Sequence, residues 1–331
     1  MPSPPVSKLG APLRLPLVAA ALGVLLAACG PTTPPAPDGD QGERASGERP
    51  RVVTTFLPIT LFTRAVAGDC AEVSSLIPPS TGPHDFQSRP GDLVALRQAR
   101  VLVKNGLELE SFLDKLVESA ENAALTVIDS SRGVATIDSD DPQDDGHAHG
   151  HSHGHSHGSV NPHIWLDPQR AMQQVENIRD GLVAVDPGCA DGYSRNAAAY
   201  IAQLRQLDDA IAADLSPFRG KTFVAFHDVA PYFAERYGLE AEFVVDVPAI
   251  NPTAADLRRV SEIVERSQLQ ALLSEPQQGN SSFNALARDL GVRISVFDPL
   301  ETGSEQDAGD PSTYLRVMRR NVADLRQAFG G

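Results

Sequence analysis

Residues 191–215 read DGYSRNAAAYIAQLRQLDDAIAADL, and this stretch decides how the chain is organised. Six of its apolar side chains recur at spacings of four and three, the period of one helical face; they are Tyr193, Ala197, Tyr200, Leu204, Leu207 and Ile211. A helix of this length would span about 37 Å, and Asp191 is placed to cap it. The pattern favours one rigid connecting helix between two halves of the chain. The alternative is an ordinary helix packed inside one domain.

Short apolar or β-branched runs alternate with helical patterns on both sides of this helix. The strands expected in the first half are 52–56, 73–77, 101–104 and 126–129, and those in the second half are 222–226, 243–245, 271–274 and 292–297. Helical periodicity appears between them, for example over 93–99 and from Leu109 to Leu116. Strands that alternate with helices predict parallel sheets with covered faces. The expected fold class is therefore α/β, with two similar lobes.

The chain begins with features of export. Residues 15–28 form an apolar run behind Arg14 and end in Leu26-Ala-Ala-Cys29, the layout of a secretory signal peptide. That ending resembles a bacterial lipobox, which implies cleavage before Cys29 and lipidation of its thiol. An ordinary signal peptide that happens to end at a cysteine is the alternative.

These patterns divide the 331 residues, a length suited to about two domains. The expected segments are a signal peptide over 1–28, a lipid-anchored flexible tether over 29–50, a first lobe over 51–190 containing an acidic and His-rich loop over 136–159, a linking helix over 191–215 and a second lobe over 216–331.

Charge and cysteine content narrow the classes of partner and compartment. The formal charge of -15 argues against a nucleic-acid partner, because neutralising phosphates needs basic patches. With Cys29 assigned to the anchor, Cys70 and Cys189 remain in a compartment where disulfides persist. A bond between them is one hypothesis, and two inert thiols are the other.

Six of the nine histidines alternate with Gly, Ser and Ala in one tract, a composition that cannot build a core. They are His147, His149, His151, His153, His155 and His157. Imidazoles on a flexible chain bind metal ions weakly, since ordering that chain costs conformational entropy. The tract is interpreted as an accessory metal-scavenging loop, with a passive insertion as the alternative.

The other three histidines are His84, His163 and His227, and each follows or ends an expected strand, as does Asp298. In open parallel sheets the carboxyl ends of strands form the ligand-binding edge, so two facing lobes would bring these side chains into one cleft. Three imidazoles and one carboxylate suit tetrahedral Zn²⁺, whereas Mn²⁺ usually recruits more oxygen. Glu275 is a possible additional ligand. Asp85, Asp167 and Asp228 adjoin histidines and are candidates to orient imidazoles, although the last two could equally cap helices.

Several segments together resemble one known family, the cluster A-I solute-binding proteins of bacterial zinc and manganese ABC transporters, in particular the zinc-binding branch. They include Pro83-His-Asp-Phe86, Asn161-Pro-His-Ile-Trp-Leu-Asp167, Phe226-His-Asp228, Ser274-Glu-Pro-Gln277 and Phe297-Asp-Pro-Leu300. The resemblance covers nearly all of 51–329. It implies two lobes joined by a long helix and a metal ion in the cleft, with ligands that map onto His84, His163, His227 and Asp298.

The same resemblance implies how such a protein acts. It would be a monomeric extracytoplasmic carrier, held at the membrane by its lipid, that passes Zn²⁺ to an ABC permease and its ATPase without catalysing a reaction. The alternatives are a manganese or broad-specificity carrier, a surface adhesin or zinc chaperone, and a zinc hydrolase with Glu275 as its base. The hydrolase is disfavoured because the sequence has no His-Glu-x-x-His helix and no nucleophile elbow.

Overall fold

The computed structural model describes residues 49–138, 160–245, 252–276 and 281–330. The signal peptide, Cys29, nearly all of the tether and the histidine tract at 147–157 lie outside these ranges. Within them, no helix is both long enough and apolar enough to cross a membrane. Residues 46–331 belong to one compact unit, and we use "lobe" for each of the two groups of strands inside it.

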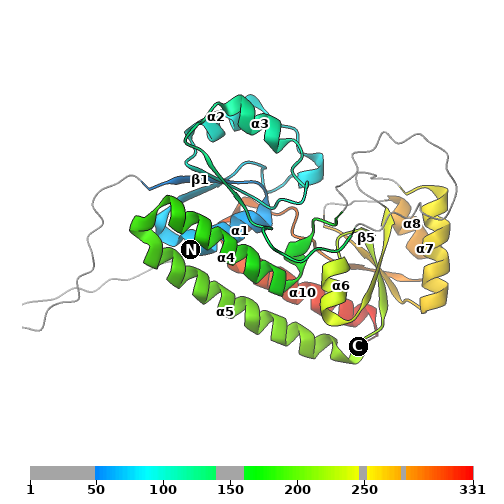
Figure 1. Ribbon diagram of the computed structural model, residues 1–331. Coiled ribbons are helices and arrows are strands. Elements are labelled where there is room, and N and C mark those ends of the chain that lie inside the picture. Colours follow the sequence, from blue (N-terminus) through cyan, green and yellow to red (C-terminus); the bar gives the residue numbers. More distant parts are fainter. Residues whose placement is uncertain (1–48, 139–159, 246–251, 277–280, 331) are drawn as a thin grey trace, which may run out of the picture. The chain divides into compact units, whose positions relative to one another are not determined.

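The first lobe is built on a four-stranded parallel sheet in the order β2-β1-β3-β4. The strands are β1 (Arg51–Thr54), β2 (Glu72–Ser75), β3 (Val101–Lys104) and β4 (Thr126–Asp129). Its four helices are α1 (Leu57–Ala67), α2 (Pro90–Gln98), α3 (Leu113–Ala120) and α4 (Pro168–Val185). Neighbouring residues of β1 point to opposite faces: Val52 packs into the core that contains α1 and α4, and Val53 packs with α2 and α3. The sheet therefore has helices on both faces (Figure 1), as predicted.

The second lobe repeats this plan with β5 (Thr222–His227), β6 (Glu240–Val245), β7 (Ala271–Ser274) and β8 (Arg293–Val296). β5 pairs with β6 and β7 pairs with β8, both in parallel. Because β5 also lies against β7, the spatial order β6-β5-β7-β8 matches that of the first lobe. The helices are α6 (Pro231–Tyr237), α7 (Ala254–Ser267), α8 (Ser281–Asp289), α9 (Glu305–Gly309) and α10 (Ser312–Ala328).

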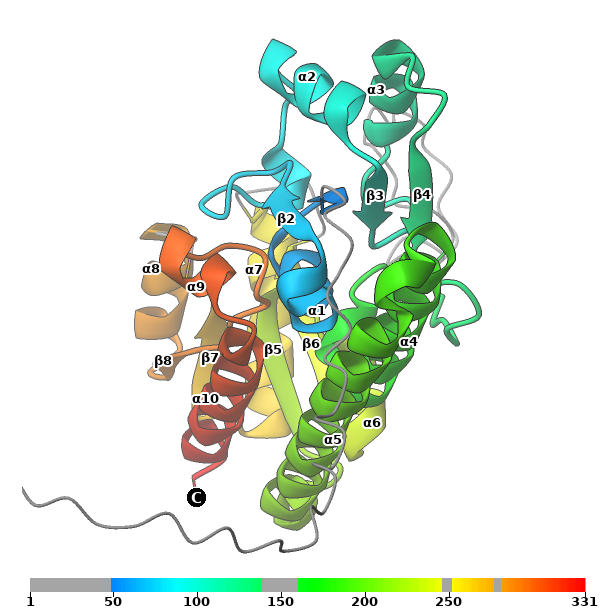
Figure 2. The ribbon, with the colours of Figure 1, turned by 90° about the vertical axis from the view of Figure 1, so that its left-hand side faces the viewer.

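The long helix expected between the lobes is α5 (Ala190–Leu215). All of the apolar positions that predicted it are buried. It packs against α1 and α4 of the first lobe and against α10 and α6 of the second (Figures 1 and 2). Asp191 does not cap it, since the helix begins one residue earlier and Cys189 holds the N-cap position. A single packed helix thus spans both lobes.

Two smaller differences from the sequence-based expectation concern the helices of the first lobe. The third helix begins at Leu113 rather than Leu109, because residues 107–112 form turns, in which the N–H of Leu109 donates to Gly106 and that of Leu113 donates to Glu110, three residues back. A helix after Asp167 was expected only from the capping alternative for that residue, and the extent of α4 was not predicted. Its buried face includes the polar Gln174, which blurs the apolar period.

A disulfide joins Cys70 to Cys189, whose Cα atoms are 6.1 Å apart. Both cysteines end short 3-10 helices, Gly68–Cys70 after α1 and Pro187–Cys189 before α5. A Cβ atom at Gly192 would lie 2.7 Å from the Sγ of Cys70 and 2.9 Å from that of Cys189. Glycine at this position in the first turn of α5 therefore makes room for the bond.

The disulfide should stabilise the fold chiefly by restricting the unfolded chain. In the double variant C70S/C189S, we expect the free energy of unfolding of the metal-free protein to fall by about 4 to 5 kcal/mol, because the bond links residues 119 positions apart. Urea denaturation followed by circular dichroism measures the change. Reducing the wild-type protein should give the same shift, and an unchanged urea midpoint in both experiments would contradict the prediction.

Candidate metal centre

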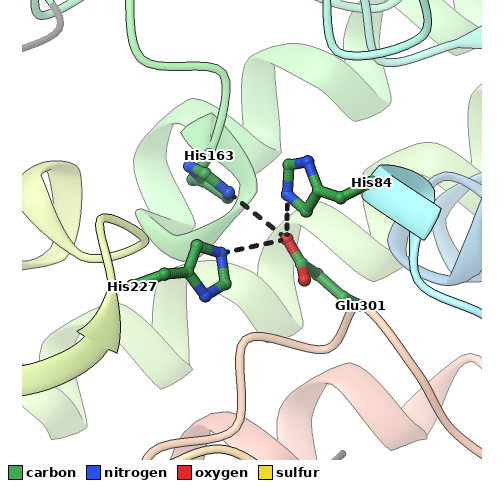
Figure 3. A group of neighbouring side chains, drawn as sticks. All are labelled: His84, His163, His227 and Glu301. Carbon is green, nitrogen blue, oxygen red and sulfur yellow. Dashed lines mark hydrogen bonds and ion pairs between the residues drawn. The ribbon is translucent and has the colours of Figure 1, made fainter. Parts of the chain in front are cut away.

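Four side chains converge where the two lobes meet: His84, His163, His227 and Glu301 (Figure 3). His84 lies in the 3-10 turn Pro83–Asp85 that follows β2, and His163 directly precedes the 3-10 turn Ile164–Leu166. His227 is the last residue of β5, and Glu301 lies in the segment after β8. Each lobe therefore contributes two of the four side chains.

The three imidazoles point their Nε2 atoms at one carboxylate oxygen of Glu301. The distances from Oε1 to Nε2 are 3.0 Å for His84, 3.3 Å for His163 and 3.6 Å for His227. A tetrahedral zinc ion with bonds near 2.0 Å would hold its ligand atoms about 3.3 Å apart. All four donor atoms lie within 4.8 Å of one another. Their spacing therefore fits a small ion placed among them.

Burial leaves part of this group without ordinary partners. The side chains of His163, His227 and Glu301 are only 2%, 5% and 3% exposed, and that of His84 is 11% exposed. Within the described part of the chain, neither His163 Nε2 nor His227 Nε2 has a hydrogen-bond partner. Buried polar atoms are normally satisfied. Two buried nitrogens that make no hydrogen bond and face the same carboxylate oxygen are therefore available to bind a ligand.

The opposite nitrogen of each buried imidazole is held from behind. Asn161 Oδ1 lies 3.0 Å from the backbone N and 2.9 Å from Nδ1 of His163. Glu275 Oε1 lies 3.2 Å from the backbone N and 2.6 Å from Nδ1 of His227. An acceptor at Nδ1 fixes the proton there and leaves the Nε2 lone pair free. Both imidazoles can therefore bind a metal ion through Nε2, once any proton on that atom is displaced.

The segment that carries Glu301 is fixed to the first lobe. Trp165 Nε1 donates to the carbonyl of Pro299 at 2.8 Å, and the N–H of Gly303 donates to the carbonyl of Pro79 at 2.7 Å. Trp165 itself packs edge-to-face against Phe56 with 5.0 Å between ring centroids. Glu301 is therefore held on both sides by residues distant in sequence.

Burial and the neighbouring charges shift the pKa values of this group in opposite directions. Burial lowers the pKa of His163 to about 3, although Glu301 acts in the other direction. Burial also lowers the pKa of His227, but the charges of Glu275 and Glu301 outweigh it and hold the pKa well above 6.5. For Glu301, burial raises the pKa, while its contacts with the histidines hold it well below 4.5. Without a metal ion, a proton on His227 partly balances the two carboxylates.

The structure brings together the three histidines proposed from the sequence but places Asp298 elsewhere. Asp298 Oδ1 accepts a hydrogen bond from the N–H of Leu300 at 2.8 Å, so its carboxylate shapes the turn before Glu301. Leu300 has a φ angle of 63°, and the turn at this residue directs Glu301 toward the three histidines. The fourth member of the group is therefore Glu301, which the sequence reasoning missed although it directly follows the Phe297-Asp-Pro-Leu300 motif.

The other acidic candidates take separate positions. Glu275 contacts the rear of His227 and is not part of the donor group. Asp167 caps α4 by accepting from the N–H of Gln169 at 2.8 Å. Asp228 accepts from the side-chain amide of Asn161 at 2.8 Å. Asp85 shares the 3-10 turn of His84. Asn161, the partner of His163, was not singled out from the sequence.

The fold and this group of donors define the chain as a two-lobed α/β protein with a centre of the kind that holds a metal ion. The family model described as "ZnuA: Zinc-uptake complex component A periplasmic" matches residues 52–328. The chain belongs to this family.

Two curated relatives are similar over most of the chain. The zinc-binding lipoprotein AdcA of Streptococcus pneumoniae is 31% identical over 277 residues, which is 83% of this chain and 55% of AdcA. The high-affinity zinc uptake system protein ZnuA of Bacillus subtilis is 28% identical over 313 residues, which is 94% of this chain and 96% of that protein. The chain thus spans little more than half of the length of AdcA.

A solved structure shares the fold. The Zn(II)-bound ZnuA-like domain of Streptococcus pneumoniae AdcA matches with a TM-score of 0.70 at 30% identity, covering 85% of this chain and 99% of that domain. The α/β architecture with its long helix is therefore that of the family.

The pKa shifts predict different protonation states for two neighbouring histidines. In the metal-free protein at pH 7, His227 should carry a proton on both nitrogens and His163 on one. Since the pKa of His227 is higher in the folded than in the unfolded chain, its stabilising effect should be present below about pH 6.5 and be lost as the pH rises through the folded pKa. Imidazole ¹⁵N shifts in a pH titration measure both states.

The variant E275Q serves as the control, because removing this charge should lower the pKa of His227. A wild-type His227 that titrates below pH 6.5 would show that the carboxylates do not dominate its environment.

Proposed function

We propose that the chain is an extracytoplasmic zinc-binding protein that captures Zn²⁺ with His84, His163, His227 and Glu301. The observation that carries this proposal is the convergence of three Nε2 atoms on one carboxylate oxygen at 3.0 to 3.6 Å in a buried site. Zn²⁺ binds imidazole and carboxylate in tetrahedral geometry. Mn²⁺ prefers a larger share of oxygen ligands, so the nitrogen-rich set favours zinc.

The site supports binding rather than catalysis. A catalytic zinc site keeps a fourth position open for water, whereas Glu301 supplies a fourth donor here. Glu275, the base that a hydrolase would need, is engaged with the backbone N and Nδ1 of His227. The zinc ion is therefore cargo.

Delivery of this cargo to an ABC permease and its ATPase is the second part of the proposal. It is supported by membership of the zinc-uptake family and by relatives named for zinc binding and high-affinity zinc uptake. The carrier would act as a monomer. The lipobox-like sequence that ends at Cys29, together with a relative named as a lipoprotein, supports a lipid anchor that keeps it at the outer side of the membrane.

The histidine tract at 147–157 is proposed as an accessory scavenger. It would raise the local zinc concentration without forming the tight site.

Calorimetric titration with Zn²⁺ and with Mn²⁺ tests the function. We expect one tight Zn²⁺ site, weaker Mn²⁺ binding, and survival of the tight site when residues 145–158 are deleted. Zinc affinity should fall as the pH drops, because protons compete for the imidazoles. Tight binding that disappears with the deleted segment, or tighter binding of Mn²⁺, would refute the assignment of the site.

A pair of matched amide substitutions tests which acid binds the ion. E301Q should weaken zinc binding by more than about 100-fold, beyond the usual cost of losing a residue that only supports a ligand. D298N keeps an acceptor for the N–H of Leu300 and should change the affinity by less than about threefold, below 1 kcal/mol. Competition with a chelator of known affinity measures both. The opposite ranking would identify Asp298 as the ligand.

A further inference from the structure

Asn161 makes hydrogen bonds with all of its polar groups while being only 2% exposed. Its backbone N–H donates to the carbonyl of Ile137 at 2.9 Å, and its backbone carbonyl accepts from the hydroxyl of Tyr232 at 2.6 Å. Tyr232, from α6 of the second lobe, is itself fully buried. The hydrogen bonds to Ile137 and Tyr232 therefore hold the backbone of Asn161 in place, so that its side chain extends from a well-defined position.

The side-chain amide faces a different partner at each end. Oδ1 lies within hydrogen-bond distance of the backbone N and Nδ1 of His163, at 3.0 and 2.9 Å. Nδ2 donates to the backbone carbonyl and to Oδ2 of Asp228, at 2.9 and 2.8 Å. Both partners at Asp228 are acceptors, so the amide cannot turn round without placing its oxygen against them. The contact with Asp228 thus fixes the orientation that His163 receives.

The orientation of the Asn161 amide determines which ring nitrogen of His163 carries the proton. With Oδ1 as its acceptor, His163 Nδ1 carries the proton and Nε2 keeps its lone pair. Nε2 is the atom that faces Glu301 at 3.3 Å. The tautomer of His163 in the first lobe therefore depends on the hydrogen bond from Asn161 to Asp228 in the second lobe.

The same amide also reaches the neighbour of another donor. Asp228 directly follows His227, the last residue of β5. One side chain therefore connects His163 of the first lobe to the residue beside His227 of the second. The ring centroids of these two histidines are 5.3 Å apart, a separation that a shift between the lobes would alter.

We propose that Asn161 is a positioning residue that couples His163 to His227 across the lobes through Asp228, and that this coupling sets the zinc affinity of the site. The inference rests on the proposed function, since it assumes that these histidines bind Zn²⁺. It adds that a residue outside the donor group determines how two donors from different lobes act together.

A double-mutant cycle on the full chain tests the coupling, with N161A, D228A and the double variant. N161A should weaken the tight zinc phase by about 10- to 100-fold, the usual cost of losing a partner that orients a metal-binding histidine. D228A should also weaken it. If Asp228 acts through the amide, D228A should add less than about threefold in the N161A background. Chelator competition gives each dissociation constant.

Two further measurements separate positioning from mere stability. The visible spectrum of bound Co²⁺ should change in N161A, because the ligand field depends on the orientation of His163. In the metal-free protein, ¹⁵N shifts of His163 should change from a single Nδ1–H tautomer to a mixture of tautomers. Asn122 provides the matched control, since its side-chain amide also bridges backbone carbonyls, those of Leu96, Arg97 and Ala99, but in the α2 and α3 region. N122A should lower stability and leave both spectra and the zinc affinity unchanged.

The outcomes are distinct. If the wild type binds zinc and N161A has the same zinc affinity and the same Co²⁺ spectrum, the inference is overturned while the proposed function stands. The inference is also overturned if D228A weakens binding by the same factor in the wild type and in the N161A variant. A wild-type chain that binds no zinc would remove the proposed function and the inference together. If N161A does not fold, D228A still tests the contact between Asn161 and Asp228, because residue 228 is only half-buried. The Co²⁺ spectrum of D228A should differ from that of the wild type. An identical spectrum with unchanged zinc affinity would overturn the inference.

Discussion

The candidate metal centre depends on a buried carboxylate surrounded by imidazoles. An isolated ionised carboxylate in an apolar interior is strongly unfavourable, yet Glu301 is 3% exposed and its pKa is held low by the histidines around it. Glu275 adds a second buried negative charge behind His227. A divalent cation among the donors would match the two charges, whereas a proton on His227 matches only one. A bound divalent cation would therefore offset the negative charge of this group more fully than a single proton does.

The two-lobed architecture explains how such a group can be assembled. The parallel strands of each lobe end at the edge that carries donors, and α5 packs against helices of both lobes. The disulfide between Cys70 and Cys189 ties the turn after α1 to the start of α5. The long helix and this bond leave the first lobe and the connector as one packed body.

The sequence predicted the α/β class, the eight strands and the long helix, because these depend on local apolar periods that the chain displays clearly. It also predicted that His84, His163 and His227 would come together, since each adjoins the carboxyl end of a strand. It did not predict Glu301, because the choice between Asp298 and Glu301 depends on a turn at Leu300 with positive φ. Leucine gives no local signal for that conformation. The contact between Asn161 and Asp228 was equally hidden, since the two residues are 67 positions apart.

One feature of the site bears on how these proteins can diversify. Glu301 belongs to the second lobe by sequence, yet its segment is hydrogen-bonded to Trp165 and Pro79 of the first. A chimera that exchanged everything after α5 with a relative would combine the donors of one parent with the supporting loops of another. Recombination at the long helix would thus separate residues that must match, so the lobes are expected to be inherited as a pair.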